Sequence, residues 1–479
     1  MKIVMSKTVN YFLRQNTDSS IAASVVSRQR PLGRFLLLTT FSLTAATISA
    51  QDDDIAKAQH TILGQNAAQA GVSVPVRNTH PDAQSFPKEG LGLFIHFGLA
   101  TVHGGIDLSW GMMANKPWED GEITPAAYWK LADRWNPVHF DAEAMVAKAK
   151  KAGFKYFVFT TKHHDGYTMW PSEYSTFGVK QKLGGRDLVK EFVNACHKHG
   201  VKTGLYYSPP DWLFDAPYKN WDYSGKTILD IHHQPMERLP EKPAGHDQAR
   251  REMVANQMRE LLTRYGRIDL FWLDGGSGEI SNDEIRQLQP GIVINRRNGE
   301  PGDYGDSEGA LPSRRFVGWF ETCDPCWPSR WWTYSTSDRM DTGADVIEKL
   351  VILRAWGGNF LANVGPCPDG SLPEEVLEAW DEMEGWMKHS GESVYDVTGG
   401  DFPEKANQPT TLKKGIVYVH AFPNFHKTIV LKGMSSSPQQ ALLLRTGETV
   451  PFSYREGKIH INIPPEKRSR MVDTIKLVW

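Results

Sequence analysis

The feature that most constrains this sequence is a repeated unit, in which an amphipathic helix ends at a glycine and a short apolar strand follows. Residues 141–160 form one such unit, with Gly153 between the helix and the strand. The same order recurs in residues 186–207 and in residues 249–273. Short, continuously apolar strands that alternate with helices are typical of a parallel sheet buried on both faces.

The length of the repeated region favours one fold class. Residues 85–395 provide about 300 residues, which suits an α/β fold with a (β/α)8-like barrel of the TIM type, regular or irregular. A smaller doubly wound sheet would use fewer residues. The sequence contains no GxGxxG or GxxxxGK[ST] loop, so nothing in it supports a nucleotide-binding version of the fold.

The pattern changes after residue 395. Short apolar strands then lie between turn residues, as in residues 415–420, 428–431 and 474–478. This spacing predicts a C-terminal antiparallel β-sandwich over residues 396–479. Because the region carries no cluster of catalytic residue types, we expect a packing module that covers the side of the barrel.

The amino terminus has the pattern of a secretory signal peptide. Basic residues precede an apolar and small-residue run from Phe35 to Ala50, which an acidic segment follows. The run is shorter than the roughly 20 apolar residues that a membrane span needs. We therefore predict a signal peptide in residues 1–50 with cleavage after Ala50, a leader segment in residues 51–84, and a periplasmic or secreted protein with no membrane span after cleavage.

Composition and charge exclude several classes of protein. Hydrophobic residues make up 40% of the chain and charged residues 23%, which is ordinary for a soluble globular protein. The formal net charge is −2, and it becomes −7 without the first 50 residues, which hold six of the 54 basic and one of the 56 acidic residues. We expect no general attraction to nucleic acid or anionic lipid. The aromatic content of 11% is high, as in proteins that stack rings on sugars.

Four cysteines are too few for a disulfide framework in a chain of this size. Cys323 and Cys326 have the spacing of half a zinc or redox motif, but no second pair and no nearby histidine complete a zinc set. The intervening Asp-Pro suggests a tight loop. Two interpretations stay open, a local disulfide or two free thiols.

Polar residues follow several of the predicted strands at the point where each strand ends. In barrels of this type the carboxyl ends of the strands converge on the active site. We predict that the following clusters form one site: His96 in a buried segment, His163 and His164 within Lys162–Gly166, Tyr206–Ser208, Asp274–Gly276, and Asn295–Arg297.

Asp274 is the sharpest candidate for a nucleophile. It follows an apolar strand on which Trp272 places an indole beside it, so its carboxylate should project from a rigid element. If the reaction splits an acetal, a second carboxyl group must donate a proton. Glu308 and Glu321 are both candidates for this acid/base, and their spacing does not choose between them.

In this order along one chain, these residues resemble those of glycoside hydrolase family 29, the α-L-fucosidases. Each matching segment is weak alone, but the ordered set is specific and spans residues 85 to about 395. The matching segments are Gly92–Gly98, Lys162–Gly166 with Trp170 and Ser172, Tyr206–Ser208, Phe271–Gly275, Asn295–Arg297, and Gly358–Gly365.

The resemblance implies a retaining, exo-acting hydrolase that acts on fucosylated oligosaccharides or polysaccharides by double displacement and needs no metal or other cofactor. It implies Asp274 as the nucleophile and favours Glu308 over Glu321 as the acid/base. The residues that it and the strand pattern assign to substrate binding or to orienting the nucleophile are His96, Trp110, His163, His164, Tyr206, Trp272, Arg297 and Trp332.

One position departs from the family pattern. Many relatives carry Glu-Trp where this chain has Ser109-Trp110, and the glutamate binds sugar hydroxyls. Ser109 supplies no carboxylate. Asp107 or His103 would have to compensate, or the sugar would carry a substituent at that hydroxyl.

Two other functions remain open from the sequence. A metal-dependent barrel hydrolase would use His96, His163, His164, Asp165 and Asp274 as ligands, and chelation would abolish its activity. A catalytically inactive sugar-binding homologue would bind an aryl α-L-fucoside without turning it over.

Overall fold

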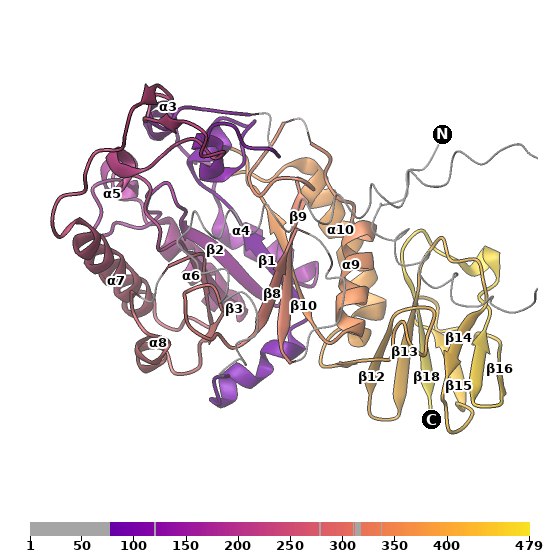
Figure 1. The fold of residues 1–479 in the computed structure, drawn as a ribbon. Coiled ribbons are helices and arrows are strands. Elements are labelled where there is room, and N and C mark those ends of the chain that lie inside the picture. The colour runs from indigo at the N-terminus through magenta and orange to yellow at the C-terminus, as the bar shows by residue number, and fades with distance from the viewer. Residues whose placement is uncertain (1–76, 119–120, 277–278, 310, 312–317, 337) are drawn as a thin grey trace, which may run out of the picture. The chain divides into compact units, whose positions relative to one another are not determined.

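The computed structural model describes residues 77–118, 121–276, 279–309, 311, 318–336 and 338–479 (Figure 1). The predicted signal peptide and residues 51–76 of the predicted leader segment lie outside these residues. Within them, no helix combines the length and the apolar character that crossing a membrane would require.

Eight parallel strands form one sheet in the order β7-β6-β3-β2-β1-β10-β9-β8. This is the cyclic order of a barrel, and among the described residues only the seam between β7 and β8 has no ladder of hydrogen bonds. Figure 1 shows the consequence, with the indigo strand β1 beside the orange strand β10. The predicted α/β barrel is therefore confirmed in an irregular form. The strands are β1 (Leu91–Ile95), β2 (Tyr156–Lys162), β3 (Lys202–Tyr207), β6 (Leu270–Leu273), β7 (Val293–Ile294), β8 (Gly305–Glu308), β9 (Phe320–Trp327) and β10 (Asn359–Val364).

Helices connect these strands. The longer ones are α4 (Ala142–Lys151), α6 (Leu188–His199), α7 (His246–Arg264), α8 (Asn282–Leu288), α9 (Gly343–Ala355) and α10 (Glu374–Ser390). The remaining helical segments are η1 (Pro81–Lys88), η2 (Leu99–Val102), η3 (Leu108–Met112), α3 (Pro125–Trp129), η4 (Lys130–Asp133), α5 (Val179–Lys182), η5 (Ala216–Tyr218), η6 (Gly391–Ser393) and η7 (Pro465–Lys467). Of all these helices, η1 precedes the eight barrel strands, and α10, η6 and η7 follow them. A small antiparallel pair, β4 (Ile228–Leu229) with β5 (Pro235–Met236), lies in the connection between β3 and α7.

Local signals set the ends of the helices. The side chain of Asp141 accepts a hydrogen bond from the Ala144 amide at the start of α4, and Asp187 caps α6 in the same way. Gly200 ends α6 in the left-handed conformation, with φ of 61°, which glycine adopts without steric cost. The predicted order of helix, glycine and strand is confirmed at this unit.

The C-terminal region is antiparallel, as predicted. One sheet has the order β11-β12-β13-β18-β15 and the other the order β14-β17-β16. Barrel helices contact this region, because the Trp386 indole of α10 donates to the Val472 carbonyl and the Trp356 indole to the Phe402 carbonyl. The strands are β11 (Thr398–Gly399), β12 (Thr410–Lys413), β13 (Ile416–Ala421), β14 (Ile429–Lys432), β15 (Gln440–Leu443), β16 (Phe452–Arg455), β17 (Lys458–Ile461) and β18 (Asp473–Val478).

The expected tight loop at Cys323 and Cys326 is wrong. Both residues lie on strand β9, and both are free thiols. The two thiols have separate partners, because Cys323 Sγ lies 3.6 Å from the Ser307 carbonyl and Cys326 Sγ 3.5 Å from the Asp324 carbonyl. Cys323 packs in the barrel core, in a cluster that includes Trp272 and Tyr304.

Glu321 is buried in the same core, near the amino end of β9, with 1% of its surface exposed. Its carboxylate accepts hydrogen bonds from the Tyr156 hydroxyl at 2.6 Å, the Trp272 indole at 3.1 Å and the Tyr304 hydroxyl at 3.2 Å. Burial raises its pKa to about 7, although these hydrogen bonds oppose the rise.

This raised pKa predicts a stability that depends on pH. The folded protein holds the Glu321 proton more tightly than the unfolded chain, whose carboxyl has its ordinary pKa of 4.5. The resulting stabilisation is present below pH 4.5 and is lost as the pH rises to about 7. Relative to Glu321→Gln, which does not titrate, the wild-type free energy of unfolding should fall by about 3 kcal/mol over this window. Denaturant unfolding at a series of pH values measures the difference, and parallel pH curves for the two proteins would contradict it.

Candidate active site

The carboxyl ends of the barrel strands bring most of the predicted residues together. This is the end at which loops of a (β/α)8 barrel converge. The residues come from seven strands or the turns that follow them: His96 after β1, His163 and His164 after β2, Tyr206 on β3, Asp274 after β6, Arg297 after β7, Glu308 at the end of β8, and Trp332 after β9.

Asp274 stands at the centre of this group. Its Oδ2 accepts a hydrogen bond from the Tyr206 hydroxyl at 2.7 Å and lies 3.6 Å from His164 Nε2. Its Oδ1 lies 3.3 Å from Arg297 Nη1. Burial alone would raise the pKa of Asp274, but His164, Arg297 and Tyr206 together hold it below its ordinary value. The carboxylate is therefore ionised near neutral pH, as a nucleophile must be.

Arg297 links Asp274 to a second carboxylate. Its Nη1 lies 2.7 Å from Glu308 Oε2, while its Nε donates to Asp306 Oδ2 at 2.6 Å and its guanidinium lies 4.6 Å from the centre of the Trp272 ring. Because the same Nη1 is 3.3 Å from Asp274 Oδ1, the two facing carboxylate oxygens are at most about 6 Å apart. Retaining glycosidases hold their carboxyl groups about 5 to 5.5 Å apart, and inverting ones about 6.5 to 9.5 Å.

Glu308 has the properties of a proton donor. Its side chain is 39% exposed at the rim, where a leaving group could reach it. Partial desolvation raises its pKa, against the opposing effect of Arg297, and the nearby charge of Asp274 raises it further. One site thus holds a carboxyl group whose pKa is lowered and another whose pKa is raised, which is the pattern of a nucleophile and an acid.

Glu321, the other candidate acid, is not brought to this rim. Its three hydrogen-bond donors hold it in the barrel core, at the N–H edge of the Trp272 indole. Trp272 in turn stacks on Tyr206, with 5.6 Å between ring centres and 19° between planes. Glu321 therefore supports the aromatic layer on which the site is built.

Three histidines line the site with their rings buried. His96 Nδ1 lies 2.7 Å from Asn363 Oδ1, His163 Nδ1 2.5 Å from Ser109 Oγ, and His164 Nδ1 2.5 Å from Ser208 Oγ. Burial lowers the pKa of all three, to about 4 for His96 and His164. All three imidazoles are neutral near pH 7.

Two predicted tryptophans lie against these histidines. The Trp332 ring is 5.1 Å from the His96 ring, and the Trp110 ring is 5.6 Å from the His164 ring. Asp107 Oδ1 accepts a hydrogen bond from the Trp332 amide at 2.8 Å, so this carboxylate helps to hold Trp332. Ser109 is fully buried against His163, whereas His103 is exposed.

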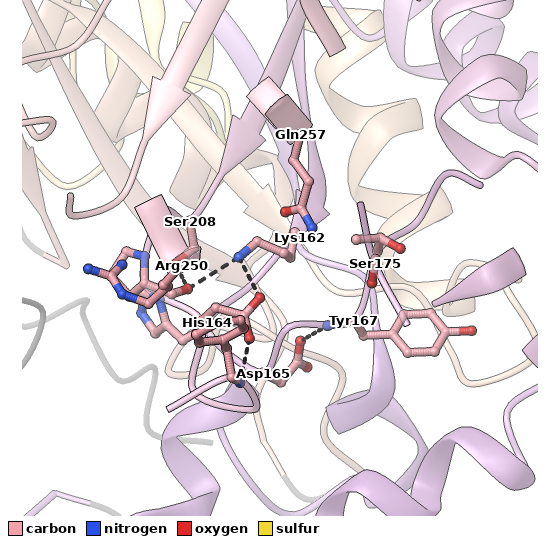
Figure 2. A network of polar contacts seen from close by, with 12 residues as sticks. Lys162, His164, Asp165, Tyr167, Ser175, Ser208, Arg250 and Gln257 are labelled. Atoms are coloured by element: carbon pink, nitrogen blue, oxygen red, sulfur yellow. Dashed lines mark hydrogen bonds and ion pairs between the residues drawn. The ribbon is translucent and has the colours of Figure 1, made fainter. Parts of the chain in front are cut away.

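The ligands of the metal-dependent alternative come together only in part. His163, His164 and Asp274 each offer one ligand atom within 4.8 Å of the other two. Asp165 is engaged elsewhere, because its carboxylate accepts from the Tyr128 hydroxyl at 2.8 Å and from the Tyr167 amide at 2.9 Å. Figure 2 shows Asp165 directed at the Tyr167 amide.

Sequence reasoning missed two residues that shape the site. Asp306 binds both Arg297 and Arg296, and Asn363 binds His96. Asp306 and Glu308 alternate along β8, so period-two spacing in this polar stretch could have revealed Asp306. Asn363 lies in Gly358–Gly365, a segment that resembles the family pattern but for which the resemblance implies no role of the asparagine.

A (β/α)8-like barrel that holds one carboxyl group of lowered pKa and one of raised pKa within about 6 Å at its carboxyl end has the arrangement of a retaining glycoside hydrolase. Comparison with known proteins agrees with this class. The family model described as Alpha-L-fucosidase matches residues 61–392. The chain belongs to the alpha-L-fucosidase family and is a glycoside hydrolase.

Relatives and solved structures extend this result. The chain is 26% identical to the alpha-L-fucosidase of Dictyostelium discoideum over 436 residues, which cover 81% of this chain and 90% of the relative. It is 26% identical to the tissue alpha-L-fucosidase of Bos taurus over 67% of this chain and 70% of that one.

Two solved structures are similar in fold. Alpha-L-fucosidase isoenzyme 1 from Paenibacillus thiaminolyticus matches with a TM-score of 0.71 and 27% identity, over 83% of this chain and 98% of that chain. A family 29 alpha-L-fucosidase from Bacteroides thetaiotaomicron, trapped as a covalent intermediate with 2-fluoro-fucosyl fluoride, matches with a TM-score of 0.69 and 26% identity, over 85% and 98%.

The contact between Tyr206 and Asp274 predicts a shifted pH profile in Tyr206→Phe. Without the hydroxyl the pKa of Asp274 should rise, so the acid limb of kcat/KM on an aryl α-L-fucoside should move to higher pH. A hydrogen bond to a charged group is worth about 1.5–3 kcal/mol, so activity should fall roughly 10- to 100-fold. Tyr207→Phe is the matched control, because that hydroxyl donates to Gln257 and not to Asp274. An unshifted acid limb in Tyr206→Phe would contradict the account.

Proposed function

We propose that this protein is an exo-acting α-L-fucosidase that releases terminal α-L-fucosyl residues from oligosaccharides or polysaccharides by double displacement, with Asp274 as the nucleophile and Glu308 as the acid/base. The observation that carries the proposal is the contact of one Arg297 nitrogen with both carboxylates. Membership of the alpha-L-fucosidase family supports the sugar. The trapped covalent intermediate of the Bacteroides relative supports a two-step reaction.

In the first step Glu308 donates its proton to the glycosidic oxygen, and Asp274 attacks the anomeric carbon from the opposite face. The bond to the leaving group breaks as the bond to Asp274 Oδ1 or Oδ2 forms, which gives a β-linked fucosyl ester. Arg297 lies against both carboxyl groups, so its positive charge is paired with an anion throughout this step. Glu308 becomes anionic as Asp274 becomes neutral.

In the second step Glu308, now a carboxylate, takes a proton from water. The water oxygen attacks the anomeric carbon and the ester bond to Asp274 breaks. α-L-Fucose leaves, Asp274 regains its charge, and Glu308 again holds a proton. Two inversions give net retention of configuration.

The remaining site residues have binding roles in this proposal. The neutral imidazoles of His96, His163 and His164 offer hydrogen-bonding nitrogens to the sugar hydroxyls. Trp332, beside His96, offers an apolar face to the sugar ring and its methyl group. No step needs a cofactor.

The proposal includes a location outside the cytoplasm. It is supported by the basic residues that precede the run from Phe35 to Ala50 and by the small residues at its end. In this proposal residues 1–50 are removed, residues 85–395 form the catalytic barrel and residues 396–479 form the packing module.

Chemical rescue by azide tests the two carboxylates separately on an activated aryl α-L-fucoside. Glu308→Ala should lose most activity, and azide should restore turnover and give the α-fucosyl azide, because the anion replaces water in the second step. Asp274→Gly should be inactive, and azide should give the β-fucosyl azide in a single displacement. Glu321→Ala is the control, because it is expected to give no azide product. An azide product from Glu321→Ala in place of Glu308→Ala would reverse the assignment of the acid/base.

Chelation separates this function from the metal-dependent alternative. The cluster of His163, His164 and Asp274 has ligand types that suit a transition metal. A double-displacement fucosidase should keep its full kcat after exhaustive treatment with EDTA. Loss of activity that returns on adding Zn²⁺ would instead assign these residues to a metal.

A further inference from the structure

The histidines of the site share one feature that the mechanism above does not use. In each ring Nδ1 is held by a side-chain oxygen. A neutral imidazole carries one proton, and the partner of one nitrogen decides whether that nitrogen or the other keeps it. The partners of Nδ1 therefore set what Nε2 can do toward a substrate.

For His96 the partner defines the tautomer. Asn363 Nδ2 donates to the Trp332 carbonyl at 2.8 Å, which orients the amide so that its oxygen faces His96 Nδ1. A carbonyl oxygen only accepts, so Nδ1 carries the proton. Nε2 of His96 then presents a lone pair.

For His164 the partner is a hydroxyl, which has a single proton to give. Ser208 Oγ lies 3.2 Å from the Pro210 carbonyl, which can only accept, and 2.5 Å from His164 Nδ1. If the hydroxyl donates to Pro210, it must accept from Nδ1–H. Ser208 and His164 lie together in Figure 2, with Lys162 beside them.

The segment that supplies this acceptor is anchored by a buried ion pair. Lys162 Nζ lies 3.1 Å from Asp211 Oδ2 and 3.4 Å from the Pro210 carbonyl, and its side chain is fully buried. Asp211 Oδ1 also accepts from the Phe214 amide at 3.0 Å. These contacts hold the Pro210 carbonyl within reach of Ser208.

The other nitrogen of His164 faces the nucleophile. Nε2 is buried and has no hydrogen-bond partner among the described residues, and its distance to Asp274 Oδ2 is 3.6 Å. With the proton on Nδ1, the lone pair of Nε2 faces the Asp274 carboxylate, and a donor beside these two atoms would satisfy Nε2. A sugar hydroxyl is such a donor.

We propose that Ser208 is a positioning residue that keeps His164 in the Nδ1–H tautomer, so that Nε2 accepts a hydrogen bond from a sugar hydroxyl beside Asp274. The hydrogen bond from the sugar hydroxyl rests on the proposed function, whereas the tautomer of His164 does not. In the opposite tautomer Nε2–H would donate to Asp274 Oδ2, in addition to Tyr206. That bond would stabilise the Asp274 carboxylate before the reaction. The proton on Nε2 would also repel the proton of the sugar hydroxyl.

The test reads the tautomer directly, by nitrogen NMR of the full-length enzyme labelled in histidine, with His164→Gln used only to assign the signals. In the free wild-type enzyme we expect the His164 signals of a protonated Nδ1 and an unprotonated Nε2. Ser208→Ala should populate the Nε2–H form, and Ser208→Thr should keep the wild-type form. A protonated Nε2 in the wild type would overturn the proposal, whether or not the variants fold.

Kinetics give the second readout, on an aryl α-L-fucoside. Ser208→Ala should lower kcat about 10-fold and raise KM, because the hydrogen bond that sets the tautomer of His164 is lost. Ser208→Thr should restore most of both. Ser393→Ala is the matched control, because it removes another fully buried hydroxyl, which donates to the Ser390 carbonyl outside the site. Wild-type kinetics in Ser208→Ala would overturn the proposal, whereas no turnover in any protein together with the expected tautomer would count against the proposed function alone.

Discussion

The geometry of the active site depends on one cation, the guanidinium of Arg297, which lies between two carboxylates. A single nitrogen of Arg297 touches both Asp274 and Glu308, and the same guanidinium is held by Asp306 and by the face of Trp272. These contacts fix the spacing of the carboxyl groups, and spacing decides whether a nucleophile or a water molecule meets the anomeric carbon. The chemistry follows from geometry that the barrel imposes at the ends of β6, β7 and β8.

Unequal surroundings give the two carboxyl groups opposite roles. Asp274 lies beside Arg297 and receives a hydrogen bond from Tyr206, and both contacts lower its pKa. Among the described residues, Glu308 has the cation of Arg297 beside it, but desolvation and the repulsion of Asp274 outweigh this contact, and its pKa is raised. The neutral histidines around them add hydrogen-bonding nitrogens without adding charge, because burial keeps them from taking up protons.

Much of this could be predicted from the sequence, and the misses have physical causes. The position of Asp274 was predictable, because a polar residue that directly follows an apolar strand lies at the active-site end of a parallel barrel. Glu321 could not be separated from Glu308, because the donors that bury it, Tyr156, Trp272 and Tyr304, come from distant segments. Strand β9 was missed because it contains Pro325 and polar residues, and its pairing with β10 is visible only in space. The tautomers of the site histidines depend on the distances from Nδ1 to its hydrogen-bond partners, and no sequence pattern gives these distances.

The most direct test of the central claim is to identify the residue that becomes covalently bound to the sugar. The wild-type enzyme is treated with 2-fluoro-fucosyl fluoride, digested, and mapped by mass spectrometry. The account predicts one added fluorofucosyl group, on the peptide that contains Asp274 and on that side chain. A label on another residue would contradict it.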